Sequence, residues 1–580
     1  MLTAAMLLLA KIILAQHPNF KTEPQNPEPG QTIRISYQPN GTVLQNERLV
    51  EALVFLHDGS NADGITAVDI LLTQQNGTWE GAIPTKPNTK ALLIAFASGE
   101  LIDNNSQEGY SILLHQKGKP MPGAHAALAM SYSWGLRGIK GKVKPEKILA
   151  LYEKELEHNP WIKEQISFNY VIAYKEARPA TAGQDLQSFY NQLVRKKDKT
   201  AQQYETLKYM AENVYKKPED AAAFREEGIR KYPDSKLAAM QLFRSFYNET
   251  DIRKKEDIAN KAARIMAQDK GFGLMQVQFM WRELAGIAAE QENWATMQQY
   301  ATRIRSKDAL ANALNSVAWE LSGEHLDSAG RHLDEARQFS AQSIHLMEEE
   351  RRTRNSKPSF MTGRDYLRNL KYDLGNLYDT YALILWKLNQ KDSAAFYQEK
   401  AIELTKGADK DMFHRFTVFL QQAKSTEVAR TMADRFLALG KNTPALSQLH
   451  QQLCLQDGFT QETYREHKQT LLDKARSVRK KELIEKRIKE PAHAFSLKDL
   501  SGKDVTLASL AGKIVIVDFW AIWCGPCRAS FPGMQQVQNK YASDNNVHFL
   551  YIDTWENKEP EKMRTDAQSF IDQNKYSFHV

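Results

Sequence analysis

Two cysteines three positions apart, Cys524 and Cys527, are the residues of this chain best suited to chemistry. They follow residues 514–519, an apolar and β-branched run with the length and composition of a strand buried on both faces. The residues after Cys527 suit a helix. Cys524 is therefore expected at a helix N-terminus, where unpaired backbone N–H groups and the helix dipole stabilise a thiolate. This arrangement predicts dithiol–disulfide chemistry.

A zinc site is the alternative interpretation, because half of such a site has the same Cys-x-x-Cys spacing. Zinc needs two further ligands. The third cysteine, Cys454, lies 70 residues upstream of the first (524 − 454) in an apolar setting. The nearest histidines, His493 and His548, lack ligand spacing to the pair. We therefore expect no zinc at the pair, no metal or cofactor in the protein, and a buried, inert Cys454.

The segment 513–532, KIVIVDFWAIWCGPCRASFP, resembles the active-site strand, loop and helix of thioredoxins, including the motif Trp-Cys-Gly-Pro-Cys and a proline within the helix, Pro532. Residues 491–497 (PAHAFSL), 500–503 (LSGK) and 510–513 (LAGK) are similar to the TlpA-like branch of that superfamily. Its members are periplasmic or membrane-facing thiol–disulfide oxidoreductases related to the alkyl hydroperoxide reductases. The resemblance implies a thioredoxin-like α/β domain over residues 491–580.

The resemblance also implies roles for individual residues. Cys524 attacks a disulfide of a protein substrate, Cys527 resolves the mixed disulfide, and the buried acid Asp518 accepts the proton of the second cysteine. An external thiol donor re-reduces the pair. The residues that support the motif are Trp523, Gly525 and Pro526. The Gly-Pro dipeptide resembles that of strongly reducing thioredoxins, and a peroxidase is disfavoured because its threonine-containing loop is missing.

The final strands of a thioredoxin fold have no counterpart in the sequence. We expect a strand at residues 547–552, a helix around 560–573 and the beginning of a strand at 578–580. No proline after Cys527 suits the loop whose cis-proline faces the dithiol. The domain is therefore expected to be truncated before this loop. The alternative function is a protein-binding scaffold with an inactive redox domain.

The N-terminal residues 1–15 are short and apolar and end in Ala15-Gln16. We expect a secretory signal peptide cleaved after Ala15, and hence a periplasmic or otherwise exported protein. A soluble N-terminal helix is the alternative, because Lys11 interrupts the apolar run and no basic residue precedes it. The absence of a nearby cysteine excludes a lipid-modified cysteine as an anchor.

Residues 20–135 follow an all-β pattern. Alternating or continuous apolar runs of strand length are separated by Asn-Gly, Asp-Gly and Pro-Gly dipeptides, and the runs occupy residues 32–37, 52–56 and 91–96. This spacing predicts a small immunoglobulin-like β-sandwich. Trp79 and Tyr110 are expected in its core, with a sugar-stacking platform as the alternative.

Residues 144–473 are predicted to be all-α. The clearest unit, 374–404, resembles a tetratricopeptide repeat, with Leu385 at a large core position and small residues at Ala382, Ala394 and Ala401. Irregular helical hairpins are the alternative. Because stacked helix pairs usually offer a concave binding surface, we expect a protein partner there.

Length and composition agree with several globular units. The chain has 580 residues, of which 42% are hydrophobic and 25% charged, so about three or four units are expected. A net charge of +7 without a basic block gives no indication of nucleic-acid binding. Three cysteines exclude a disulfide scaffold, and no apolar run is long enough to span a membrane.

Residues 474–490 mix basic and acidic side chains at helical spacing, which predicts a solvated linker helix.

Overall fold

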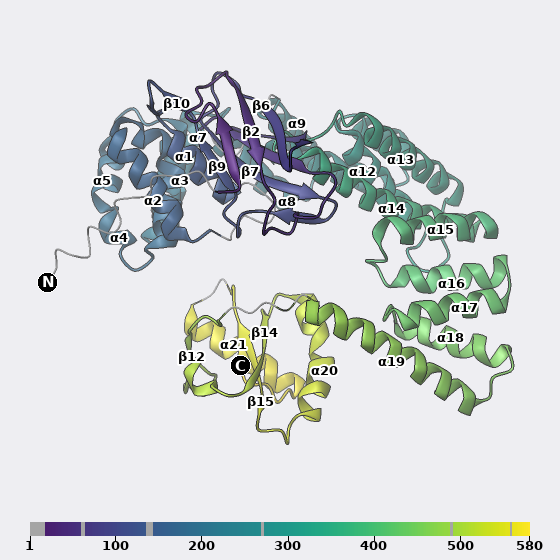
Figure 1. The fold of residues 1–580 in the computed structure, drawn as a ribbon. Helices are drawn as coiled ribbons and strands as arrows, with labels where there is room; N and C mark the ends of the chain where they lie inside the picture. The colour runs from purple at the N-terminus through teal and green to yellow at the C-terminus, as the bar shows by residue number, and fades with distance from the viewer. Residues whose placement is uncertain are drawn as a thin grey trace. The chain divides into compact units, whose positions relative to one another are not determined.

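The computed structural model forms two compact units, Met1–Val478 and Arg479–Val580 (Figure 1). It describes residues 18–59, 64–134, 143–267, 272–485, 487, 491–556 and 559–580. The predicted signal peptide, residues 1–15, lies outside them. Among the described helices, none is long and apolar enough to cross a membrane.

The first unit begins with two antiparallel sheets. One contains, in spatial order, β1 (Phe20–Glu23), β2 (Thr32–Tyr37), β6 (Thr78–Pro84) and β5 (Thr73–Gln75). The other contains β4 (Ile65–Leu71), β3 (Glu51–His57), β7 (Ala91–Ser98) and β8 (Leu101–Asp103), with β9 (Tyr110–Leu113) also paired to β7. A short hairpin follows, formed by β10 (His115–Gln116) and β11 (Lys119–Pro120).

Side chains from both sheets meet in one core, which confirms the predicted sandwich. Tyr37 of β2 stacks on Phe96 of β7, with ring centroids 3.7 Å apart. The hydroxyl groups of Tyr37 and Tyr110 both donate to Asp103 Oδ2, at 2.6 and 2.9 Å. Trp79 and Tyr110 are each only 3% exposed. Their prediction as core residues is confirmed, and the sugar-stacking alternative is wrong because neither ring presents a face to solvent.

The two central strands, β3 and β7, are buried on both faces. Val54 and Ile94 point into the sandwich core, whereas Phe55 and Leu93 pack into a second core with α1 (Ala124–Trp134). A strand that is covered on both sides has no solvent-facing positions, so its residues can all be apolar. This explains the continuous apolar runs of β3 and β7.

A long array of helices follows, which confirms the predicted all-α region. Consecutive helices pack in pairs through short connections, as in helical hairpins (Figure 1). The helices are α2 (Pro145–His158), α3 (Lys163–Ala177), α4 (Ala182–Asp185), α5 (Gln187–Arg195), α6 (Ala201–Tyr209), α7 (Pro218–Lys231), α8 (Lys236–Asn248), α9 (Ile252–Ile265), α10 (Phe272–Glu290), α11 (Trp294–Ala301), α12 (Lys307–Leu321), α13 (Leu333–Thr353), α14 (Gly363–Lys387), α15 (Lys391–Thr405), α16 (Asp411–Ala423), α17 (Thr426–Ala438), α18 (Pro444–Gln456) and α19 (Gln461–Glu485).

The repeat-like unit predicted at residues 374–404 forms the hairpin of α14 and α15. Its small residues are fully buried where the two helices approach each other, as expected: Ala382, Ala394 and Ala401. Gly375 permits the same close approach, because a Cβ there would lie 2.6 Å from Thr405 Cγ2. Residues 474–485 of the predicted linker continue the helix α19, which begins at Gln461.

The sandwich is joined to the helices by a buried carboxylate, Glu155 of α2. Its Oε1 accepts from the backbone N–H of Gly123 at 2.8 Å and its Oε2 from that of His125 at 2.9 Å. Asn159 donates its side-chain amide to Oε1 at 2.7 Å. Glu155 therefore satisfies the N-terminal backbone of α1, the helix that covers β3 and β7.

A second junction protects the edge strand β4. The backbone N–H of Ala67 donates to Ser359 O at 2.7 Å, and the N–H of Arg364 donates to Asp69 Oδ2 at 3.1 Å. The segment before α14 thus pairs with an edge that would otherwise offer free backbone groups. The sandwich and helices form one compact unit for these reasons.

The second unit contains a hairpin, β12 (Ser496–Lys498) and β13 (Asp504–Thr506), followed by a β-α-β-α segment. The latter consists of β14 (Ile514–Trp520), α20 (Gly525–Lys540), β15 (Val547–Asp553) and α21 (Pro560–Asn574). β14 and β15 pair in parallel. These elements confirm the predicted strands and helices of the C-terminal α/β region. The strand expected at 578–580 is not formed, although Tyr551 N donates to His579 O at 2.9 Å.

The prediction that residues 514–519 are buried on both faces is wrong. One face of the β14–β15 pair packs on α20 and α21 through Trp520, Phe531 and Tyr551. On the opposite face of β14, Val517 is 40% exposed and Phe519 is 60% exposed. Apolar composition alone does not reveal this difference, because it cannot show whether a second layer covers the sheet.

Replacing Glu155 by Gln is expected to destabilise the first unit by on the order of 3 kcal/mol, because an amide directs N–H groups at backbone donors in a buried site. Burial favours protonation of Glu155, but hydrogen bonds from His125, Gly123 and Asn159 outweigh it and lower its pKa to about 2. Urea unfolding followed by far-ultraviolet circular dichroism measures the effect.

Since the folded-state pKa is depressed, the stabilisation is present above the unfolded value of 4.5 and is lost as the pH falls toward 2. The difference between wild type and Glu155→Gln should shrink over that range. Glu157→Gln, an exposed change on the same helix, is the control. Equal stability of the two variants at pH 7 would contradict this role of Glu155.

Candidate active site: the dithiol at the start of α20

The strand β14 delivers the chain directly to the dithiol. After Trp520, a short turn is closed by the backbone N–H of Cys524, which donates to Ala521 O at 3.0 Å. Thr554 N, which follows β15, donates to Trp520 O at 2.9 Å. Pro526 lies in the first turn of α20, where its missing N–H costs no helical hydrogen bond. These local features place Cys524 immediately before the helix.

Cys524 is the N-cap residue of α20. Its sulfur accepts a hydrogen bond from the backbone N–H of Cys527 at 3.3 Å, and the two cysteines form a disulfide with their Cα atoms 5.3 Å apart. Both residues are half-buried. Because each sulfur is bonded to the other, neither is available as a zinc ligand in this state.

The helix N-terminus favours a negative charge on Cys524 once the disulfide is reduced. The first N–H groups of a helix have no intrahelical partners, and the helix dipole is positive at this end. A thiolate at Cys524 is stabilised by both. Cys527 lies within the helix and packs against the apolar core that contains Trp520 and Phe531.

Asp518 lies on the strand that leads to the dithiol. Alternation along β14 places it on the same face as Ile516 and Trp520, two residues that contact the core against which Cys527 packs. Burial raises the pKa of Asp518. Burial, with a smaller contribution from Asp518, also raises the pKa of its cross-strand neighbour Tyr551 to about 12. A carboxyl group of raised pKa is suited to accept a proton from a thiol.

Two residues after β15 contact the motif loop although the sequence pattern does not single them out. Glu556 Oε1 accepts from the backbone N–H of Ile522 at 2.6 Å, and Trp523 Nε1 donates to Trp555 O at 3.2 Å. They come close because β14 and β15 are parallel, so the carboxyl ends of both strands lie at one edge. Their position directly after the second strand is the signal that could have identified them.

Two tryptophans at this edge of the second unit are exposed to solvent. Trp523 is 63% exposed and Trp555 is 78% exposed. Exposed tryptophans are characteristic of surfaces that bind polypeptides. The motif proline Pro532 lies inside α20, as its position in the sequence implied.

The residues considered as further zinc ligands, Cys454, His493 and His548, make no contact with the two sulfurs among the described residues. Cys454 is fully buried in α18, as predicted. His548 Nε2 lies 3.0 Å from His579 Nδ1, so this ring interacts with the C-terminal residues. No contact of His493 with the two sulfurs is present among the described residues.

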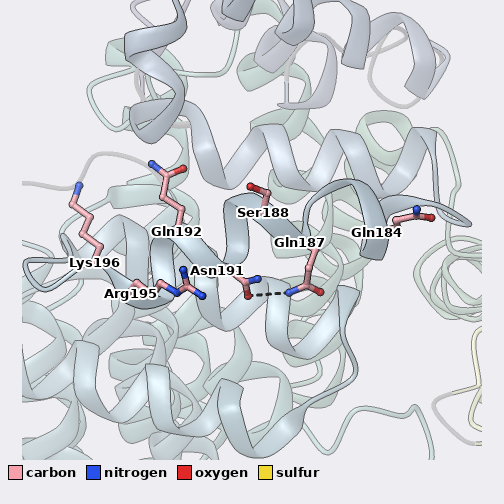
Figure 2. Close-up of a pocket in the computed structure, with 7 residues that line it drawn as sticks. All are labelled: Gln184, Gln187, Ser188, Asn191, Gln192, Arg195 and Lys196. Atoms are coloured by element: carbon pink, nitrogen blue, oxygen red, sulfur yellow. Dashed lines mark hydrogen bonds between the residues drawn. The ribbon is translucent and has the colours of Figure 1, made fainter.

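Figure 2 shows a separate surface pocket in the first unit, lined by polar side chains of α4 and α5 and by Lys196. Within it, Gln187 Nε2 donates to Asn191 Oδ1 at 3.0 Å. The lining residues include neither a carboxylate nor a thiol, and their only charged groups are those of Arg195 and Lys196. The dithiol is therefore the stronger candidate for chemistry.

Together, the parallel β-α-β segment and its dithiol define a thioredoxin-like site. Residues 488–580 match the AhpC/TSA family, so this part of the chain is an AhpC/TSA-family domain. The thioredoxin-like protein YneN of Bacillus subtilis (strain 168) is 47% identical over 53 residues, which are 9% of this chain and 31% of that protein. The thiol–disulfide oxidoreductase ResA of Halalkalibacterium halodurans is 32% identical over 91 residues, 16% of this chain and 48% of that protein.

The chain thus spans less than half the length of these two relatives. Among solved structures, the APC/C hetero-tetramer Cut9–Hcn1 is similar with a TM-score of 0.25 and 14% identity, covering 57% of this chain and 55% of that one. A similarity at this level supports no inference about function. The family match concerns residues 488–580, so the comparisons support a function for the C-terminal domain alone.

Proposed function

We propose that this chain is an exported thiol–disulfide oxidoreductase that reduces protein disulfides. The observation that carries the proposal is the disulfide between Cys524 and Cys527 at the N-terminus of α20. The AhpC/TSA family match and the similarity to ResA and YneN support the same chemistry.

The reaction begins with the reduced pair. The Cys524 thiolate attacks one sulfur of a substrate disulfide, so that a bond forms between Cys524 and that sulfur while the substrate S–S bond breaks. The other substrate sulfur leaves as a thiolate and takes up a proton. The backbone N–H groups at the start of α20 stabilise the attacking thiolate before this step.

Cys527 then resolves the mixed disulfide. Its proton passes to Asp518, directly or through water, and the resulting thiolate attacks Cys524 Sγ. The second substrate sulfur leaves, the substrate has gained two electrons and two protons, and the Cys524–Cys527 disulfide remains. An external dithiol donor returns two electrons to this disulfide and is itself oxidised.

The surface around the dithiol supports a polypeptide substrate. Trp523, which directly precedes Cys524, and Trp555 are both exposed, and the Trp523 indole is oriented by its hydrogen bond to the Trp555 carbonyl. Large, rigid aromatic surfaces bind polypeptide chains with little loss of side-chain entropy. We assign the helical array of the first unit to docking of a protein partner, because stacked helix hairpins offer extended surfaces.

The apolar segment 1–15 supports export, which also explains the need for an external donor, because exported compartments favour disulfides. The mature protein is expected to begin after Ala15. N-terminal sequencing of the chain from fractionated cells of its source tests this. Recovery of chains with intact Met1 from the cytoplasm would argue against export.

Serine variants test the roles of the two cysteines. With a disulfide-bearing protein such as insulin, Cys527→Ser should accumulate a mixed disulfide through Cys524, because the resolving thiol is gone. Cys524→Ser should trap at least about tenfold less substrate. A Cys527 thiol with a pKa one unit above that of Cys524 has about tenfold less thiolate at the same pH. Non-reducing electrophoresis and mass spectrometry of the adduct measure both.

Ser543→Ala is the control, because this exposed residue lies outside the dithiol and its replacement should leave trapping unchanged. Asp518→Asn should slow release of reduced substrate while leaving the first attack intact. Equal trapping by Cys524→Ser and Cys527→Ser would refute the assigned roles. Absence of trapping by every variant would favour a binding scaffold with an inactive redox domain.

A further inference from the structure

Four potential metal ligands converge near the end of the first unit. Asp434 of α17, His450 and Cys454 of α18, and His467 of α19 each offer one ligand atom, and these atoms all lie within 4.8 Å of one another. The three helices follow one another along the chain (Figure 1). His450 and Cys454 are four residues apart, so they occupy the same face of α18.

The spacing of the donor atoms is already close to that of a metal site. His450 Nε2 and His467 Nε2 lie 2.7 and 2.6 Å from the same oxygen, Asp434 Oδ1. Cys454 Sγ lies 3.4 Å from His450 Nε2. In a tetrahedral zinc site with bonds of about 2.0–2.3 Å, neighbouring donors are about 3.3–3.6 Å apart. The two imidazole–carboxylate pairs need to open by less than about 1 Å to reach this geometry, whereas the most widely spaced donors, which lie within 4.8 Å of each other, need to close by up to about 1.2 Å.

The burial of the cluster is graded. His450 and Cys454 are fully buried, whereas the side chains of Asp434 and His467 are 18% and 27% exposed. An ion therefore has an approach from the Asp434 and His467 side. Arg430 holds the carboxylate through the oxygen that does not contact the histidines, because its Nη1 lies 3.0 Å from Asp434 Oδ2. Its Nε lies 2.5 Å from Asp457 Oδ2. The positive charge of Arg430 is thus shared with a second carboxylate.

We propose that Asp434, His450, Cys454 and His467 bind a structural divalent metal ion, with Zn²⁺ as the best match. Two imidazole nitrogens, one thiolate and one carboxylate are ligands that zinc accepts, and four protein donors make a closed, structural site. With neutral histidines, the ion and its two anionic ligands sum to zero charge, which suits a largely buried position.

Binding exchanges protons for the metal. A cysteine binds a metal ion as its thiolate, so the thiol proton of Cys454 must leave when the ion binds. Metal binding forms the metal–sulfur bond and releases this proton to solvent. It also displaces the Nε2 protons that the histidines share with Asp434, and each neutral ring then carries its proton on Nδ1. Affinity should consequently fall with decreasing pH.

The bound ion would fix α19 to the helices before it. His467 lies between Tyr464 and Leu471 at helical spacing, and both of these residues are buried on the same face of α19. One ligand on α17, two on α18 and one on α19 link three successive helices. This link adds to the apolar contact of Leu471 with the core of α16 to α18.

Cobalt titration tests the site directly. The full-length chain, with Cys524 and Cys527 kept as their disulfide, is stripped with a chelator and titrated with Co²⁺. One ion per chain should bind with a thiolate-to-cobalt charge-transfer band, and Zn²⁺ should displace it. Cys454→Ala should abolish the band, and His467→Ala should weaken binding by about tenfold or more.

The control variant is His345→Ala, which removes an exposed histidine from α13 and should leave the titration unchanged. Zn²⁺ should also raise the unfolding midpoint of wild type more than that of His467→Gln, a milder change at the partly exposed ligand. Failure of the folded wild-type chain to bind one ion would overturn the proposal and leave a hydrogen-bonded cluster only. Equal binding by wild type and Cys454→Ala would overturn it as well.

Discussion

The chemistry of the second unit depends on the short connection between a strand and a helix. β14 ends at Trp520 and α20 begins at Gly525, so Cys524 caps a helix whose first N–H groups have no partners within it. The parallel pairing of β15 with β14 brings Glu556 and Trp555 to the same edge. The position of Cys524 at the helix N-terminus and the contacts of the motif loop with Trp555 and Glu556 follow from this arrangement.

The first unit depends on a different constraint, the double burial of β3 and β7. One face of these strands closes the sandwich, and the other packs against α1. The same sheet therefore contributes to the sandwich core and to the core of the first helices. Glu155 completes this arrangement because it satisfies the N-terminal backbone of α1 from within α2. The pairing of β4 with residues before α14 adds a second attachment far along the chain. A β-sandwich and a helical array therefore share one compact unit.

The sequence predicts those features that depend on local pattern. The dithiol, its helix, the strand runs of the sandwich and the small residues between α14 and α15 are all readable from spacing. The exposed face of β14 is not, because apolar composition does not show whether another layer covers a strand. Glu556 and the cluster of Asp434, His450, Cys454 and His467 depend on contacts between separate elements. Only the four-residue spacing of His450 and Cys454 is visible in the sequence, and the other two ligands come from neighbouring helices.

The pH dependence of thiol alkylation shows whether the N-terminus of α20 activates Cys524. The reduced full-length chain is treated with iodoacetamide at a series of pH values, and modification of each cysteine is followed by peptide mass spectrometry. If the helix N-terminus activates Cys524, its alkylation midpoint should lie below about 7.5, the range of thiols at helix N-termini, and the midpoint of Cys527 should be higher. A Cys524 midpoint near 8.5, the value of an unperturbed cysteine, would contradict this activation.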